Sequence, residues 1–314
     1  PPPMGRLDIA SFPPPDLTGS YFIDSVLTGN WTTAWSALGQ LTLPVILFSI
    51  IGILYKNNPL HFDWDQIRYV SVLGRIGVTG FFVTLILMNS TTFKQRLLWV
   101  VGILVAYWAA MMFIPVPGFG AGDLSIEGNL AGFIDRAIMP GRLVQKNFDE
   151  NGWFEHIPAT ALVLMGAMAG ELLKLQTYSK IRKVVLLSIS GVVSILLGLL
   201  WGLHFTINKH LWSSSFILLV AGISLLTLAL FFLIIEVWGL KMWSFFFVVI
   251  GLNSIAIYLA AQFINFQSTA DRLLNGFYQM SSDPVQAFIS ALGVLALEWV
   301  LLYFLYKKRI FFKV

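Results

Sequence analysis

The sequence lacks cysteine, and charged residues make up only 11% of its 314 positions. The first absence excludes disulfide bonds and thiolate metal sites. Soluble domains carry roughly 25% charged residues. Because 57% of this chain is hydrophobic, a water-soluble fold of this length could not cover its surface with polar groups. The composition therefore predicts a protein that lies in a membrane.

A compact basic patch is also missing, although the net charge is +4. The basic residues lie at the ends of apolar runs, which is the distribution that membrane topology produces. We therefore expect membrane lipid as the surroundings of the chain and no nucleic acid as a partner. A secretory signal peptide is not expected either, because the chain opens with Pro1, Pro2 and Pro3 and shows no basic region before an apolar core.

What the sequence has in abundance is long apolar runs. A helix needs about 20 apolar residues to cross a hydrocarbon core. The runs are continuous and do not alternate every second residue, as the strands of a membrane barrel would. We predict an all-α fold, a polytopic transmembrane helical bundle of about eight spanning helices. They are expected at residues 41–57, 69–90, 97–114, 157–176, 184–203, 212–236, 243–265 and 285–306.

The connections between these runs alternate in charge. Basic residues gather on one set, from Lys94 and Arg96 to Lys307 and Lys308, and acidic residues on the other. The positive-inside rule makes the basic set and the C-terminus cytoplasmic. The long 115–155 connection then lies on the outer side. Residues 41–314 are expected to form the transmembrane domain, after a Pro-rich or interfacial segment at 1–40 whose side the pattern does not define.

Polar residues inside apolar runs need a partner or a task, because a charge at mid-membrane costs roughly 2.5–3.5 kcal/mol. Arg75, Glu171 and Glu298 are such residues, and Asn253 lies at a depth similar to the two glutamates. Arg75 stands between glycines, which allow close approach, so a cavity-lining role is favoured over pairing. For Glu171, pairing with a nearby cation is an equal alternative.

All four histidines fall at the outer ends of runs or in outer connections: His61, His156, His204 and His210. An imidazole titrates near neutrality and suits a general base. Interfacial hydrogen bonding is the alternative for each. No spacing typical of a metal site is found, so no metal is expected.

The 115–155 connection is too long for an ordinary loop and is not polar throughout. Such loops are usually functional or disordered. The Gly-rich run at 118–122 follows no strand and precedes no Lys-Ser or Lys-Thr, which argues against a phosphate-binding loop. A lid or re-entrant segment over a cavity is the preferred interpretation.

Several motifs in this loop and beyond it resemble one family. They are VLGRIG at 72–77, PVPGFGAGD at 115–123, GNLA at 128–131, IDR at 134–136, INKHLWSSS at 207–215 and GLNS at 251–254. In order and spacing, from about residue 45 to the C-terminus, they are similar to bacterial relatives of heparan-alpha-glucosaminide N-acetyltransferase.

The resemblance implies a multi-pass transmembrane acyltransferase of the bacterial inner membrane. It would transfer acetyl from cytoplasmic acetyl-coenzyme A to an amino sugar or glycan on the periplasmic side, and a homodimer would fit the family. His61, His156 and His210 are then candidate bases, and Asn253 a donor to the acyl carbonyl. The expected substrate- and cofactor-binding residues are Arg75, Asp123, Asn129, Asp135, Arg136, Asn208 and Lys209.

The family's catalytic histidine motif, expected between its first two helices, is not found here. We expect that the chain lacks those two helices; divergence of the region is the alternative. Two other functions therefore stay open beside the transferase: a transporter or flippase for an amphiphilic glycan, and a catalytically inactive homologue.

Overall fold

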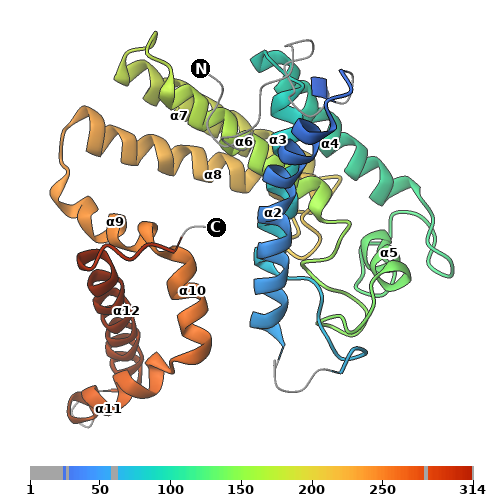
Figure 1. Ribbon diagram of the computed structural model, residues 1–314. Coiled ribbons are helices and arrows are strands. Elements are labelled where there is room, and N and C mark those ends of the chain that lie inside the picture. The colour runs from blue at the N-terminus through green and yellow to red at the C-terminus, as the bar shows by residue number, and fades with distance from the viewer. Residues whose placement is uncertain (1–23, 26–27, 58–62, 279–281, 313–314) are drawn as a thin grey trace. The chain divides into compact units, whose positions relative to one another are not determined.

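The computed structural model in Figure 1 describes residues 24–25, 28–57, 63–278 and 282–312. Within these ranges the regular structure is helical, and the β interaction found there is an isolated bridge between Val116 and Gly120. The predicted all-α fold is confirmed. The chain packs as two compact units that divide between Leu233 and Ile234.

The first unit holds seven helices among its described residues. They are α2 (Trp31–Lys56), α3 (Val72–Met88), α4 (Phe93–Phe113), α5 (Leu130–Ile138), α6 (His156–Lys174), α7 (Lys180–Gly202) and α8 (Ser214–Phe232). A π-helical turn η1 (Leu233–Val237) follows α8. The second unit continues with η2 (Met242–Ser244), α9 (Phe245–Leu252), α10 (Ser254–Phe263), α11 (Phe266–Tyr278) and α12 (Asp283–Lys307).

All eight predicted spans are helical, but not all are long enough to cross a bilayer. In the described part of the chain, five helices are long and apolar enough to cross a membrane, and the bent pair α9–α10 makes a sixth if it is one span. The apolar part of α2 (Thr42–Lys56) and α3 are shorter than the roughly 20 residues that a span requires. The expected count of eight thus exceeds the five or six that length and composition support. The chain is a multi-pass membrane protein.

Polar side chains define where the helices begin. Ser71, Thr92, Asn129 and Ser213 each accept a backbone N–H of the first turn of the helix that follows. Such caps satisfy donors that a helix start leaves unpaired. Asn30 caps α2 in the same way, so this helix begins at Trp31 and not near residue 41 as predicted. The apolar run marked only the C-terminal part of α2.

Glycines bring neighbouring helices of the first unit into close contact. A Cβ on Gly77 of α3 would lie 3.0 Å from the Cα of Val45 in α2. Gly191 of α7 and Gly222 of α8 face each other, and a Cβ on either would lie within 2.9 Å of the other's carbonyl oxygen. Figure 1 shows α7 and α8 side by side. Gly77, two residues after Arg75, therefore admits the backbone of α2.

The packing brings several helix ends together at one end of the first unit. The starts of α3, α6 and α8 meet the ends of α4 and α7, and segment 114–155 lies among them with α5 (Figure 1). Tyr107 of α4 donates its hydroxyl to the carbonyl of Leu211, 2.7 Å away, and Ser214 donates to the carbonyl of Leu104, also at 2.7 Å. We call this region the capped end of the first unit.

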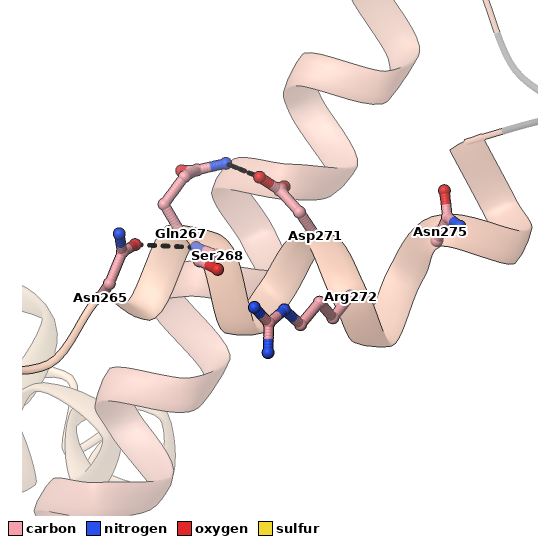
Figure 2. Close-up of a pocket in the computed structure, with 6 residues that line it drawn as sticks. All are labelled: Asn265, Gln267, Ser268, Asp271, Arg272 and Asn275. Atoms are coloured by element: carbon pink, nitrogen blue, oxygen red, sulfur yellow. Dashed lines mark hydrogen bonds between the residues drawn. The ribbon is translucent and has the colours of Figure 1, made fainter.

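In the second unit, α9 and α10 meet at a 62° bend beside Asn253. The fully buried Asn253 amide donates to the carbonyl of Ile310 (3.0 Å) and accepts the N–H of Phe312 (3.1 Å). It thereby ties the bend to the segment after α12. Along α11 runs an open polar pocket of about 540 Å³, where Figure 2 shows Gln267 directed toward Asp271.

The close packing of α7 on α8 predicts that a single methyl group added at their contact destabilises the fold. Gly222→Ala should lower the thermal unfolding midpoint by several degrees, because the new Cβ would meet the Gly191 carbonyl at 2.6 Å. Circular dichroism of the detergent-solubilised protein measures it. The control is Gly166→Ala on α6, where nothing lies within 4 Å and alanine favours the helix. Equal midpoints for the two variants would contradict the contact.

Candidate functional site

A cluster of charged side chains is buried at the capped end. Asp135 of α5 and Glu155, directly before α6, are fully buried, and Arg75 of α3 is 5% exposed. Buried charges are costly unless paired or hydrogen-bonded. Here several of their polar atoms have no hydrogen-bond partner in the described structure: Arg75 Nε and Nη1, Asp135 Oδ2, and both Glu155 carboxyl oxygens. Such orphaned atoms mark this cluster as the candidate site.

The two carboxyl groups face each other across Gly152. Asp135 Oδ2 and Glu155 Oε2 both lie within 2.6 Å of the point where a Gly152 side chain would begin. Only glycine leaves the two groups this space. Asp135 is held by its other oxygen, which accepts the backbone N–H of Trp153 at 3.0 Å. The pair is therefore built from α5 and from the turn that leads into α6.

Arg75 is held beside the pair without pairing directly with it. Its Nη2 donates to the backbone carbonyl of Glu150 at 2.7 Å, and its guanidinium carbon lies 4.3 Å from the centre of the Trp212 ring. Glu155 is its strongest electrostatic partner. Trp212 has a φ of 48°, a left-handed conformation that is rare for a bulky residue and costs strain. The strained backbone places an aromatic face on the arginine.

A second arginine, Arg68, fixes the segment that covers the cluster. Arg68 donates from Nε and Nη2 to the two oxygens of Asp149, at 2.7 and 2.6 Å. Two-pronged contacts of this kind are among the strongest hydrogen-bonded ion pairs. Asp149 also accepts the backbone N–H groups of Val144 and Asn151. Segment 139–155 is thus tied to the residues that precede α3.

Burial changes the acidity of both carboxyl groups. It raises the pKa of Asp135 to about 6, although the backbone N–H groups of Trp153 and Phe154 act in the opposite direction. Burial also raises the pKa of Glu155 well above its usual range, and the nearby negative charge of Asp135 adds to the effect. Arg75 lowers both, but less strongly. The pair therefore favours a protonated state.

His156 lies next to this pair at the start of α6. Its ring is buried, and its Nδ1–H donates to the Gly152 carbonyl at 2.6 Å. That hydrogen bond leaves the lone pair on Nε2, the form in which an imidazole can accept a proton. The ring stacks on Trp153, with 5.5 Å between ring centres.

Two curated proteins are similar to the chain along 88% of its length. They are heparan-alpha-glucosaminide N-acetyltransferase of Mus musculus and of Homo sapiens, each 27% identical over 336 residues. The chain is related to heparan-alpha-glucosaminide N-acetyltransferase. It spans about half the length of these relatives, 50% of the mouse protein and 49% of the human one. No family model matches the chain.

Among the residues that the likeness to these acetyltransferases marked, Arg75, Asp135 and His156 come together in the cluster. Asn129 and Arg136 lie in the same segment but serve its backbone. Asn129 caps α5, accepting the Gly132 N–H at 2.7 Å, and Arg136 donates to the carbonyls of Asn147 and Glu127.

Asp123 is similarly engaged with a turn. It accepts the backbone N–H of Ser125 at 2.8 Å, and that hydrogen bond, with help from the Ser125 hydroxyl, lowers the pKa of Asp123.

In the 207–215 motif, the residue that contacts Arg75 is Trp212. Asn208 accepts the backbone N–H groups of His210 and Leu211, which shapes the turn before α8. His210 is exposed, with Nδ1 3.3 Å from a carboxyl oxygen of Glu150, and Lys209 is exposed as well.

The remaining candidates belong to other parts of the chain or are not among the described residues. Asn253 belongs to the second unit, where the backbone of the C-terminal segment occupies its amide. His61 lies outside the described residues. Glu171 pairs with Arg96 of α4, which is the pairing alternative considered for it, with a different cation nearby.

Sequence reasoning passed over Glu155, Arg68, Asp149 and Tyr107. The acids were recognised only as outer-side charges. One signal was present in the sequence. Glu155 directly precedes the apolar helix that begins with His156, and a carboxyl group next to an apolar helix is a candidate for burial.

The raised pKa of Asp135 predicts how stability depends on pH. Between about pH 4 and about 6 the folded protein keeps a proton on Asp135 that the unfolded chain has lost, so stability falls as pH rises through this window. Asp135→Asn removes that titration. The difference between the unfolding midpoints of the variant and of the wild type should therefore shift in favour of the variant from pH 4 to 6, as measured by thermal unfolding in detergent. Glu127→Gln, at an exposed carboxylate, is the control; parallel curves for wild type and Asp135→Asn would refute the assignment.

Proposed function

We propose that this protein is a transmembrane acetyltransferase that moves an acetyl group from acetyl-coenzyme A to the amino group of an amino sugar or glycan. The relationship to two proteins named as N-acetyltransferases supports the reaction class. The buried cluster of Arg75, Asp135, Glu155 and His156 supports the location, because it is the place in the first unit where orphaned donors and acceptors meet.

Acetyl transfer makes two demands that this cluster answers. The acceptor amine has to lose a proton to a base, and the thioester carbonyl oxygen needs donors as negative charge develops on it. His156 Nε2 and the two carboxyl groups are the available bases. Arg75 keeps two N–H groups, on Nε and Nη1, without an acceptor, and these are suited to the oxyanion.

The charge pattern supports a direction for the reaction. Lys94, Lys174 and Lys180 lie at the ends of α4, α6 and α7 that are opposite to the capped end. With the positive-inside rule, the capped end faces the periplasm of a bacterial inner membrane, and the C-terminus is cytoplasmic. Acetyl-coenzyme A entering from the cytoplasm would present its acetyl group, and not its pyrophosphate, to Arg75. The amino sugar would arrive from the periplasm.

Transport is the second candidate function, favoured by the same buried polar groups and by a covering segment. Purified protein in proteoliposomes, given labelled acetyl-coenzyme A and glucosamine, separates the two. Acetylated glucosamine is the expected result. Uptake of glucosamine without acetylated product would indicate a transporter in place of a transferase. Absence of both product and uptake would indicate an inactive homologue.

Arg75→Ala should lower the turnover number about 100-fold, the usual loss when a transition-state donor is removed. The rate of product formation at saturating substrates measures it. The control is Arg272→Ala, which removes an exposed arginine on α11. Unchanged turnover in a folded Arg75→Ala protein would exclude the oxyanion role.

A further inference from the structure

The buried cluster has one more carboxyl group than it has guanidinium groups, so it needs one proton to be neutral. Two guanidinium groups, Arg68 and Arg75, and three carboxyl groups, Asp135, Asp149 and Glu155, are buried together. Arg68 and Asp149 neutralise each other through their two hydrogen bonds. Arg75 is then the remaining buried cation of the cluster, and it stands against two carboxyl groups. A buried carboxylate without a countercharge takes up a proton instead.

The other groups around the pair do not supply the missing charge. Tyr107 of α4 uses its hydroxyl as a donor to Leu211, and the Nδ1–H of His156 on α6 is committed to the Gly152 carbonyl. Glu150 adds a further negative charge, but its side chain is 40% exposed and is screened by solvent. The balance therefore depends on Asp135, Glu155 and Arg75.

Geometry places the proton between the two carboxyl groups. Asp135 Oδ2 and Glu155 Oε2 point to the same space beside Gly152, and neither has a donor. A proton on one of these oxygens would make it a donor to the other. One proton thus satisfies two orphaned atoms and leaves the single negative charge that Arg75 can balance.

We propose that Asp135 and Glu155 share one proton and that this pair serves as the proton relay of the acetyl transfer. This proposal rests on the proposed function. The amine nitrogen forms a bond to the thioester carbon, the C–S bond breaks with its electron pair going to sulfur, and the amine proton passes to the carboxyl pair. The pair returns a proton to the thiolate, so that amide and free thiol are the products and the pair ends as it began.

Arg75 explains why the second proton would not stay. When the pair holds two protons it is neutral, and the guanidinium beside it is left as a buried cation with no countercharge. That state is costly. Release of the proton to the thiolate restores the charge balance, so the same arginine that stabilises the resting pair drives the return step.

Infrared spectroscopy of the purified protein tests the shared proton without any substrate. The wild type at pH 7 should show the carbonyl band of a protonated carboxylic acid. Glu155→Gln should lose it, because Asp135 is then the single carboxylate beside Arg75. Asp135→Asn should keep a band at a shifted position, because burial keeps Glu155 protonated while its proton loses the carboxylate acceptor. Glu127→Gln should keep the wild-type band. If the wild type lacks the band, if Glu155→Gln retains it, or if Asp135→Asn leaves its position unchanged, the proton is not shared.

Kinetics tests the relay. Glu155→Gln should lower kcat about 100-fold with KM changed less than about twofold, the size of effect expected for a lost proton-transfer group. The pH of half-maximal rate should also fall by about one unit, because Asp135 no longer faces a second carboxyl. Glu127→Gln should match the wild type.

The outcomes separate this inference from the function on which it rests. Wild-type protein that forms no product refutes the proposed transferase, whatever the infrared band shows. Product formation with an unshifted pH profile in Glu155→Gln refutes the relay and leaves the transferase standing. A shifted pH profile in Glu155→Gln, together with loss of its band and a shifted band in Asp135→Asn, supports the relay.

Discussion

Burial of three carboxyl groups beside two arginines is the constraint on which the capped end depends. Three of the five groups reach the cluster from different elements: Arg75 from α3, Asp135 from α5, and Glu155 from the residue before α6. Arg68 and Asp149 lock the covering segment in place with two short hydrogen bonds. Removing one partner of such a buried pair is strongly destabilising, since the other charge stays behind. The electrostatics of the cluster therefore explains why segment 139–155 is ordered on the helix ends.

Strain and unsatisfied atoms occur together at this end. Trp212 adopts a left-handed backbone and covers the Arg75 guanidinium, while two N–H groups of that guanidinium remain without an acceptor. A fold selected for stability alone would pair these donors and relax this backbone. Both costs are understandable in a site prepared for a reacting group. The glycine at position 152 serves the same arrangement, since any side chain there would separate the two carboxyl groups.

Much of the architecture could be predicted from local pattern. Continuous apolar runs identified the helices, and Arg75 was singled out because an arginine in such a run needs a task. The pattern failed where polar residues continue a helix, as at the start of α2, where Asn30 caps residues that no apolar run marks. The family resemblance marked Asn129 and Arg136 as binding residues, and in the structure their side chains hydrogen-bond to the backbone of a helix start and of a turn. A polar side chain in a motif looks the same in sequence whether it holds a ligand or the backbone.

The sequence by itself determined the membrane environment, the helical fold, the alternation of charge between connections and the relationship to an N-acetyltransferase. The first three follow from composition, periodicity and the distribution of charge, which are local properties; the relationship follows from the resemblance of motifs in order and spacing. Only the tertiary structure decided that Asp135 and Glu155 meet across Gly152, that Arg75 lies near Glu155, and that Asn253 is held by the C-terminal segment. Asp135 and Glu155 are 20 positions apart in the chain, and no periodicity records which side chains a folded segment brings within hydrogen-bonding range.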